Sequence, residues 1–124
     1  QPYLNRIDNI HGVEEYLYSK EIGVAGQCDC IAEYKGKLSI IDFKSSSKQR
    51  DEDYNYANFL QTSAYAKMYE EIFPKYKIEQ TVVLTACADG FVQEWIHGKE
   101  KFSAHQELFY KHTKDFLDKM KINS

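Results

Sequence analysis

The sequence has neither an even set of cysteines nor a long apolar run. Its three cysteines, Cys28, Cys30 and Cys87, cannot all pair, which is typical of a reducing, intracellular compartment. Cys28 and Cys30 form one C-x-C, and the sequence lacks the second pair that would complete a zinc or iron–sulfur set. No stretch approaches the roughly 20 apolar residues of a membrane span, so we expect no membrane association.

Basic residues are too few for a protein that coats nucleic acid. The formal net charge is −3, whereas a general DNA-coating protein would be basic. The same argument does not apply to a metal-dependent enzyme, because a carboxylate cluster adds acid residues whose charge a bound cation neutralises.

The length and composition are those of one globular domain. The chain has 124 residues, of which 43% are hydrophobic and 28% charged, and it contains no repeat or low-complexity tract. We therefore expect residues 1–124 to form a single domain. The chain begins with Gln1 rather than Met, which we interpret as the sign of a fragment or a processed product.

Hydrophobic periodicity predicts an α+β domain with a mixed β-sheet flanked by helices, in the order β-β-β-α-β-β-α. Residues 1–11 are expected to be a lead-in or the remnant of a helix. The other expected elements are strands over 13–19, 22–34 and 37–45, a helix over 56–73 ended by Pro74, strands over 78–86 and 91–97, and a helix that begins near Ser103.

The dipeptide Lys35-Gly36 predicts a tight hairpin between two of these strands. If the loop has two residues, Tyr34 pairs with Lys37 and Asp29 lies directly opposite Asp42. Their Cβ atoms would then be about 5 Å apart on one face of the sheet. A loop of three residues would place the two aspartates on opposite faces.

Two facing carboxylates destabilise a sheet unless one is protonated or a cation lies between them. Divalent cations favour such oxygen ligands. Lys44 follows Asp42 by two residues, so it shares that face and could position an attacking water or stabilise charge on a phosphate. Alternatively, Asp29 and Asp42 are ordinary strand residues and Lys44 is their ion-pair partner. The apolar run Leu38–Ile41 before Asp42 indicates a buried strand and weakens that alternative, but the residues alone leave both open.

Three motifs in order resemble those of RecB-type PD-(D/E)XK nucleases, a family that includes mitochondrial and phage exonucleases. The first is Gly26-Gln27-Cys28-Asp29, the second runs Ile40-Ile41-Asp42-Phe43-Lys44-Ser45-Ser46, and the third is Gln61-Thr62-Ser63-Ala64-Tyr65. The resemblance extends from about Gly12 to Tyr65. It implies a restriction-endonuclease-like fold and a metal-dependent DNA nuclease, an exonuclease that acts on single-stranded DNA ends.

The resemblance also implies roles for individual residues. Asp29, Asp42 and the backbone carbonyl of Phe43 would bind Mg²⁺ or Mn²⁺, and Lys44 would be the catalytic lysine. Gln61 and Tyr65, at positions i and i+4 of one helix, would support the lysine or contact a substrate phosphate. The alternative for this last pair is a helix surface with a half-buried ring.

An upstream glutamate of the family would fall at Glu14 or Glu15, and the spacing favours Glu14. Strand alternation allows only one of the two to face the site, and a solvated strand edge is the alternative for Glu14. Many relatives place a histidine on a helix before these strands. His11 is too close to the first strand for that role, so we expect the N-terminal helical segment of the family to be missing from this chain.

The polar segment after the second motif is the expected contact with nucleic acid. Lys48 and Arg50 would bind phosphates, and Tyr54 would offer a ring for base stacking. The alternative is a solvated loop whose charges are balanced by the acids at 51–53.

The expected partner is therefore DNA, single-stranded by resemblance, with a helicase, a polymerase or the missing N-terminal segment as further partners. Two other functions stay open. One is a structure-specific endonuclease on the same fold, and the other is a non-catalytic module that binds nucleic acid.

Overall fold

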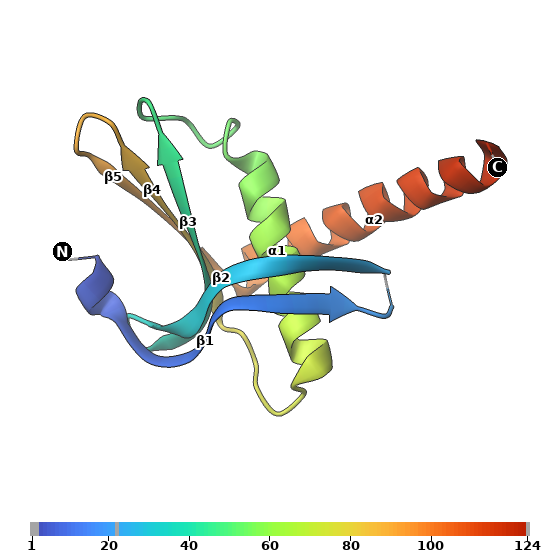
Figure 1. The fold of residues 1–124 in the computed structure, drawn as a ribbon, viewed down its shortest axis with the longest axis horizontal. Helices are drawn as coiled ribbons and strands as arrows, with labels where there is room; N and C mark the ends of the chain where they lie inside the picture. Colours follow the sequence, from blue (N-terminus) through green and yellow to red (C-terminus); the bar gives the residue numbers. More distant parts are fainter. Residues whose placement is uncertain (1–2, 22, 124) are drawn as a thin grey trace.

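The computed structural model describes residues 3–21 and 23–123 and contains one mixed sheet and two α-helices in that part of the chain (Figure 1). The elements, in chain order, are a short 3-10 helix Leu4–Arg6, β1 Ile7–Ser19, β2 Val24–Tyr34, β3 Lys37–Ser46, α1 Tyr56–Ile72, β4 Gln80–Cys87, β5 Val92–Gly98 and α2 Lys99–Asn123. This order confirms the predicted α+β fold.

The strands lie in the order β1-β2-β3-β4-β5, and each strand neighbours the next along the chain. Only β3 and β4 are parallel among these pairs; the other three are antiparallel. A parallel pair requires a crossover, and α1 supplies it. Consequently α1 lies across one face of the sheet, over the central strand β3.

Both helices pack on that same face. Phe59 of α1 contacts the rings of Trp95 and His97 on β5, and Phe102 of α2 is buried in the cluster that includes Ile40 of β3. Strand alternation therefore directs every second residue of β3, starting from Ile40, towards the helices. Among the described residues, neither helix is both long enough and apolar enough to cross a membrane.

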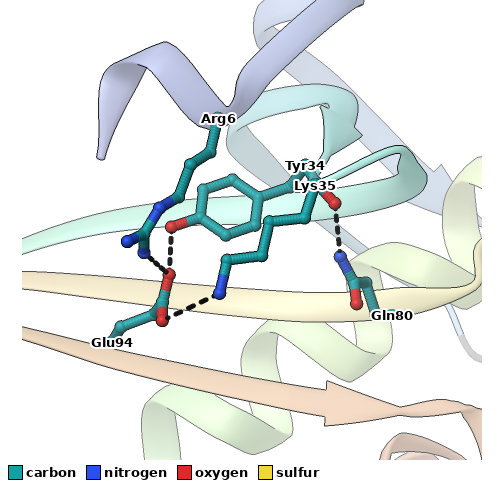
Figure 2. Close-up of polar contacts among 5 residues, drawn as sticks. All are labelled: Arg6, Tyr34, Lys35, Gln80 and Glu94. Atoms are coloured by element: carbon teal, nitrogen blue, oxygen red, sulfur yellow. Dashed lines mark hydrogen bonds and ion pairs between the residues drawn. The ribbon is translucent and has the colours of Figure 1, made fainter. Parts of the chain in front are cut away.

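A network of polar side chains lies on the other face of the sheet (Figure 2). Glu94 of β5 accepts hydrogen bonds from the Tyr34 hydroxyl, the Arg6 guanidinium and the Lys35 ammonium. Burial alone would raise the pKa of Glu94, but the hydroxyl and the two cations outweigh it and hold that pKa below its ordinary value. Gln80 adds a 2.8 Å bond to the carbonyl of Tyr34. The network thus connects the 3-10 helix, through Arg6, and the β2–β3 turn, through Lys35, to the edge strand β5.

Two predicted boundaries are wrong by more than two residues. The first strand begins at Ile7 rather than residue 13, because Ile7 and Asp8 pair with the end of β2 across an irregularity that extends to Gly12. Residues 7–11 are therefore strand and not a helical remnant, while residues 1 and 2 lie outside the described chain. The last helix begins at Lys99 rather than Ser103, and burial of Phe102 in its first turn accounts for the earlier start.

Removing the centre of the network should destabilise the fold. Glu94→Ala leaves Tyr34, Arg6 and Lys35 without their shared acceptor, so we expect the free energy of unfolding to fall by about 1–3 kcal/mol. Urea denaturation at an unchanged m value measures this loss.

Glu52→Ala is the matched control, because its ion pair with Lys101 is exposed on both sides. Such a pair contributes less than about 1 kcal/mol. Equal losses in the two variants would show that the network does not hold the sheet together.

Candidate active site

The β2–β3 hairpin has the register predicted from its turn. Tyr34 pairs with Lys37, and the ladder continues to the pair Cys30 and Ile41. Lys35 and Gly36 both adopt positive φ, at 52° and 84°, as a two-residue turn that matches the strand twist requires. The predicted two-residue loop is confirmed.

The ladder stops one step before Asp29 and Asp42, where β2 and β3 separate, so the predicted direct pairing of the two aspartates is not formed. Beyond this point, β2 turns away with β1, whereas β3 continues beside β4 and β5 (Figure 1). The backbone N–H of Phe43 donates to Asp29 Oδ2 at 2.8 Å, so a side chain takes the place of a backbone acceptor. Asp29 is thereby fixed in the fork between the strands.

Asp42 lies on the helix-facing side of β3 and is 4% exposed. Burial, reinforced by the neighbouring Asp29 carboxyl, raises its pKa to about 6 even though Lys44 acts in the opposite direction. Lys44 Nζ lies 3.1 Å from Asp42 Oδ2, and its side chain is 35% exposed. The structure thus brings the two carboxyls and the lysine together at the fork.

The donor chemistry of this cluster fits a hard divalent cation. Asp42 Oδ2 is buried and forms an ion pair with Lys44 Nζ at 3.1 Å, but no well-aligned hydrogen bond reaches it from the described part of the chain. Burial also raises the pKa of Cys28 to about 12, which keeps this neighbouring thiol protonated. Oxygen ligands are therefore the ones available, as Mg²⁺ and Mn²⁺ prefer.

The chain offers two carboxylates rather than a complete ligand set. Within residues 3–21 and 23–123, no group of three or more His, Cys, Asp or Glu is placed to hold a metal. In a strand, the N–H and C=O of one residue point to the same edge, so the Phe43 carbonyl is directed into the fork like its N–H. Its role as a ligand stays a prediction.

Tyr65 of α1 is 5% exposed and lies next to the carboxyl pair. Burial raises its pKa, and the charges of Asp42 and Asp29 contribute further. The ring packs directly on the backbone of β2: a Cβ added to Gly26 would lie 2.8 Å from Tyr65 Cε1. Gly26 therefore permits this approach. The sequence motif contained Gly26, but only the packing of α1 on β2 gives the reason for it.

Gln61 and Glu14 are less directly connected to the carboxyl pair. Gln61 is exposed, one helical turn before Tyr65. Glu14 is exposed and has a φ of 53°. It occupies the step between the pairs Val13–Cys30 and Glu15–Cys28, opposite Asp29 in a register that is unchanged across that step. Its backbone carbonyl accepts a hydrogen bond from Gln27 Nε2 at 3.2 Å. The catalytic roles suggested for Gln61 and Glu14 stay predictions.

The segment after β3 holds the expected nucleic-acid residues. The Arg50 guanidinium lies 4.4 Å from the centroid of the Tyr54 ring and also donates to the hydroxyl of Ser46. Gln93 of β5 fixes this segment by accepting the N–H of Arg50 and donating to its carbonyl. Lys48 is exposed. The segment is thus anchored near the tip of β3, and its contact with DNA stays a prediction.

Comparison with known proteins gives consistent matches. The family model described as the PD-(D/E)XK nuclease superfamily matches residues 5–119. Over 92 residues, which cover 73% of this chain, the chain is 30% identical to mitochondrial genome maintenance exonuclease 1 of Mus musculus and 28% identical to that of Homo sapiens. The match spans 27% of each of those proteins, so the chain corresponds to about a quarter of their length.

A solved structure shares the fold. The crystal structure of a candidate exonuclease from Eubacterium rectale superposes with a TM-score of 0.67, over 94% of this chain and 47% of that one. The sequence identity is 9%, so this likeness concerns the fold alone.

The raised pKa of Asp42 should make stability depend on pH. In the unfolded chain this group titrates near its ordinary pKa of 3.8, whereas in the folded protein its pKa is about 6. The folded state therefore binds more protons between these values, and the free energy of unfolding falls as pH rises from about 4 to about 6.

We therefore expect Asp42→Asn to be more stable than the wild type at about pH 8 in EDTA, by on the order of 3 kcal/mol at most. The difference should shrink towards zero at about pH 4. Urea denaturation at both pH values measures it, with the exposed Asp115→Asn as control. A difference for Asp42→Asn that is the same at both pH values would contradict the raised pKa.

The contact between Gly26 and Tyr65 predicts a strong coupling. Gly26→Ala places a methyl group against the ring, and we expect a loss of about 1–3 kcal/mol in stability. In a Tyr65→Ala background the same change should be nearly neutral, which a double-mutant cycle measures. Gly98→Ala is the control, since nothing lies within 4 Å of a Cβ there. Additive effects of the two changes would mean that the ring does not limit position 26.

Proposed function

Because the chain belongs to the PD-(D/E)XK nuclease superfamily, we propose that its carboxyl pair is the centre of a metal-dependent nuclease that hydrolyses phosphodiester bonds in DNA. Nucleases of this superfamily generally use divalent metal ions. The observation that carries the proposal is the position of Asp29 and Asp42 in the fork, with Lys44 Nζ 3.1 Å from a buried oxygen of Asp42.

In this proposal, Asp29, Asp42 and the Phe43 carbonyl hold Mg²⁺ or Mn²⁺. When bound, such an ion supplies positive charge that polarises a phosphate and acidifies water. Asp29 is held in place by the Phe43 N–H, and this fixes the spacing between the carboxyls. The burial of Asp42 keeps water from screening its charge, so a cation is favoured there more than at the protein surface.

Lys44 positions the nucleophile. Its ammonium is paired with Asp42, yet about a third of the side chain reaches solvent, so it faces the space that a phosphate would enter. There it orients the attacking water and stabilises the negative charge that develops on the phosphate oxygens. Tyr65 packs against Gly26 of β2 near the carboxyl pair, and Gln61 and Glu14 are assigned supporting roles from the family motifs alone.

The substrate proposed is single-stranded DNA, cut from an end. Support comes from the two relatives that are named exonucleases, and from the surface beyond β3. There Lys48 and the Arg50–Tyr54 stack offer a cation and a ring, which suit a flexible strand.

Removing any of the three central side chains should abolish cleavage. We expect Asp29→Ala, Asp42→Ala and Lys44→Ala each to lower turnover of end-labelled single-stranded DNA by about 100-fold or more in Mg²⁺ or Mn²⁺. EDTA should stop the wild type. Lys37→Ala, an exposed lysine at the start of the same strand, is the control and should cut normally.

Circular dichroism should show that each variant folds. Wild-type turnover by Lys44→Ala would contradict the mechanism, and wild-type digestion in EDTA would contradict the metal requirement. Cleavage of circular single-stranded DNA would show that the enzyme is an endonuclease rather than an exonuclease, because a circle has no end.

A further inference from the structure

A hollow of about 470 Å³ lies between β1 and the C-terminal half of α1, within the size range of pockets that take small ligands. Most of its lining residues, from both elements and from the segment after α1, are aromatic: His11, Tyr16, Tyr18, Tyr69, Phe73 and Tyr76. None of these rings has a role in the proposed cleavage site.

Some of these rings are rigidly held, and others are open to solvent. The Tyr69 hydroxyl and His11 Nδ1 are 3.1 Å apart, and the His11 ring meets Tyr76 edge-on with centroids 4.8 Å apart. Tyr16 is 78% exposed and Phe73 46% exposed. The hollow therefore combines a fixed aromatic floor with free ring surface, the combination on which flat ligands stack.

The charges favour a nucleobase over a phosphate inside the hollow. Glu15 lines it, and a carboxylate repels phosphate but accepts hydrogen bonds from the amino group of a base. Cations lie at its margins: Lys75 Nζ is 5.6 Å from the centroid of the Tyr76 ring, and Lys20 lines an adjacent hollow that shares Tyr18. A base would lie against the rings while its backbone reaches the lysines.

The hollow adjoins the carboxyl pair along both of its walls. Glu15 pairs across the strands with Cys28, the residue before Asp29. Tyr69 follows Tyr65 by one turn of α1, and one turn is about 5.4 Å. A strand with one phosphate at the carboxyls could therefore place a nearby base in the hollow.

We propose that this hollow stacks an unpaired nucleobase of the DNA strand that enters the carboxyl site. This inference rests on the proposed function and gives it a physical basis for selecting single strands. In a duplex, both faces of each base are covered by its neighbours and its amino groups are paired. The rings and Glu15 then have nothing to bind.

Binding of a short oligodeoxynucleotide with one internal 2-aminopurine tests the proposal. The titration is made in EDTA, so that cleavage plays no part. The wild type should change the 2-aminopurine fluorescence and bind the single strand more tightly than the matching duplex. Phe73→Ala and Tyr16→Ala should each weaken binding by about 5- to 100-fold, with an unchanged dependence on salt, because rings contact no phosphate.

Phe91→Ala is the matched control. Phe91 is 52% exposed, similar to Phe73, but lies at the β4–β5 turn and does not line the hollow. Phe73 is more buried than Tyr16. If circular dichroism shows a folding defect in Phe73→Ala, the binding result of Tyr16→Ala therefore decides the test.

The proposal is overturned if Phe73→Ala and Tyr16→Ala both bind like the wild type, or if Phe91→Ala weakens binding as much as they do. It is also overturned if the wild type does not bind the single strand more tightly than the duplex. The result is separable from the proposed function. If the wild type binds the base in the hollow but does not cleave DNA, only the proposed nuclease activity is refuted. If it cleaves DNA but does not stack a base in the hollow, only the proposed role of the hollow is refuted.

Discussion

The close approach of the Asp29 and Asp42 carboxyls is the interaction on which the rest of this structure depends. A two-residue turn fixes the register of β2 and β3, and the strands then part at the step where the two aspartates would have paired. Asp29 takes the N–H of Phe43, which leaves both carboxyls in one small, partly desolvated space. Like charges in such a space require a proton or a cation. In the protein without a bound ion, the raised pKa of Asp42 favours the first of these, protonation of one carboxyl.

Other parts of the fold hold this arrangement in place. α1 crosses the face that carries Asp42 and packs Tyr65 against β2, which Gly26 permits. On the opposite face, the Glu94 network fixes the β2–β3 turn, so the register that sets the aspartates is tied to the far edge of the sheet. The aromatic hollow lies beyond Tyr65 on the same helix. Tyr65, beside the carboxyl pair, and Tyr69, in the hollow, thus follow one another along α1.

The sequence predicted the features that depend on local pattern. Lys35-Gly36 predicted the turn type and, through it, the register of β2 and β3, which holds as far as Cys30 and Ile41. The direct pairing of Asp29 with Asp42 that this register implied is not formed, because the strands separate one step earlier. The order of elements followed from periodicity. The separation of β2 from β3 could not be predicted, because the residue pattern of each strand does not show where two paired strands diverge. The positive φ of Glu14 and the early start of β1 likewise come from pairing with β2. The contact of Tyr65 with Gly26 requires the packed position of α1, which no local pattern encodes.

The most direct test of the account is the effect of a divalent ion on stability. Thermal unfolding of the wild type and of Asp42→Asn is followed at about pH 8 with increasing Mn²⁺ or Mg²⁺. An ion held by the carboxyl pair binds the folded state alone, so the wild-type Tm should rise with the logarithm of ion concentration. Asp42→Asn should show little rise, although its carboxyl repulsion is gone. An equal rise in both proteins, or none in either, would contradict the claim that the pair is built for a cation.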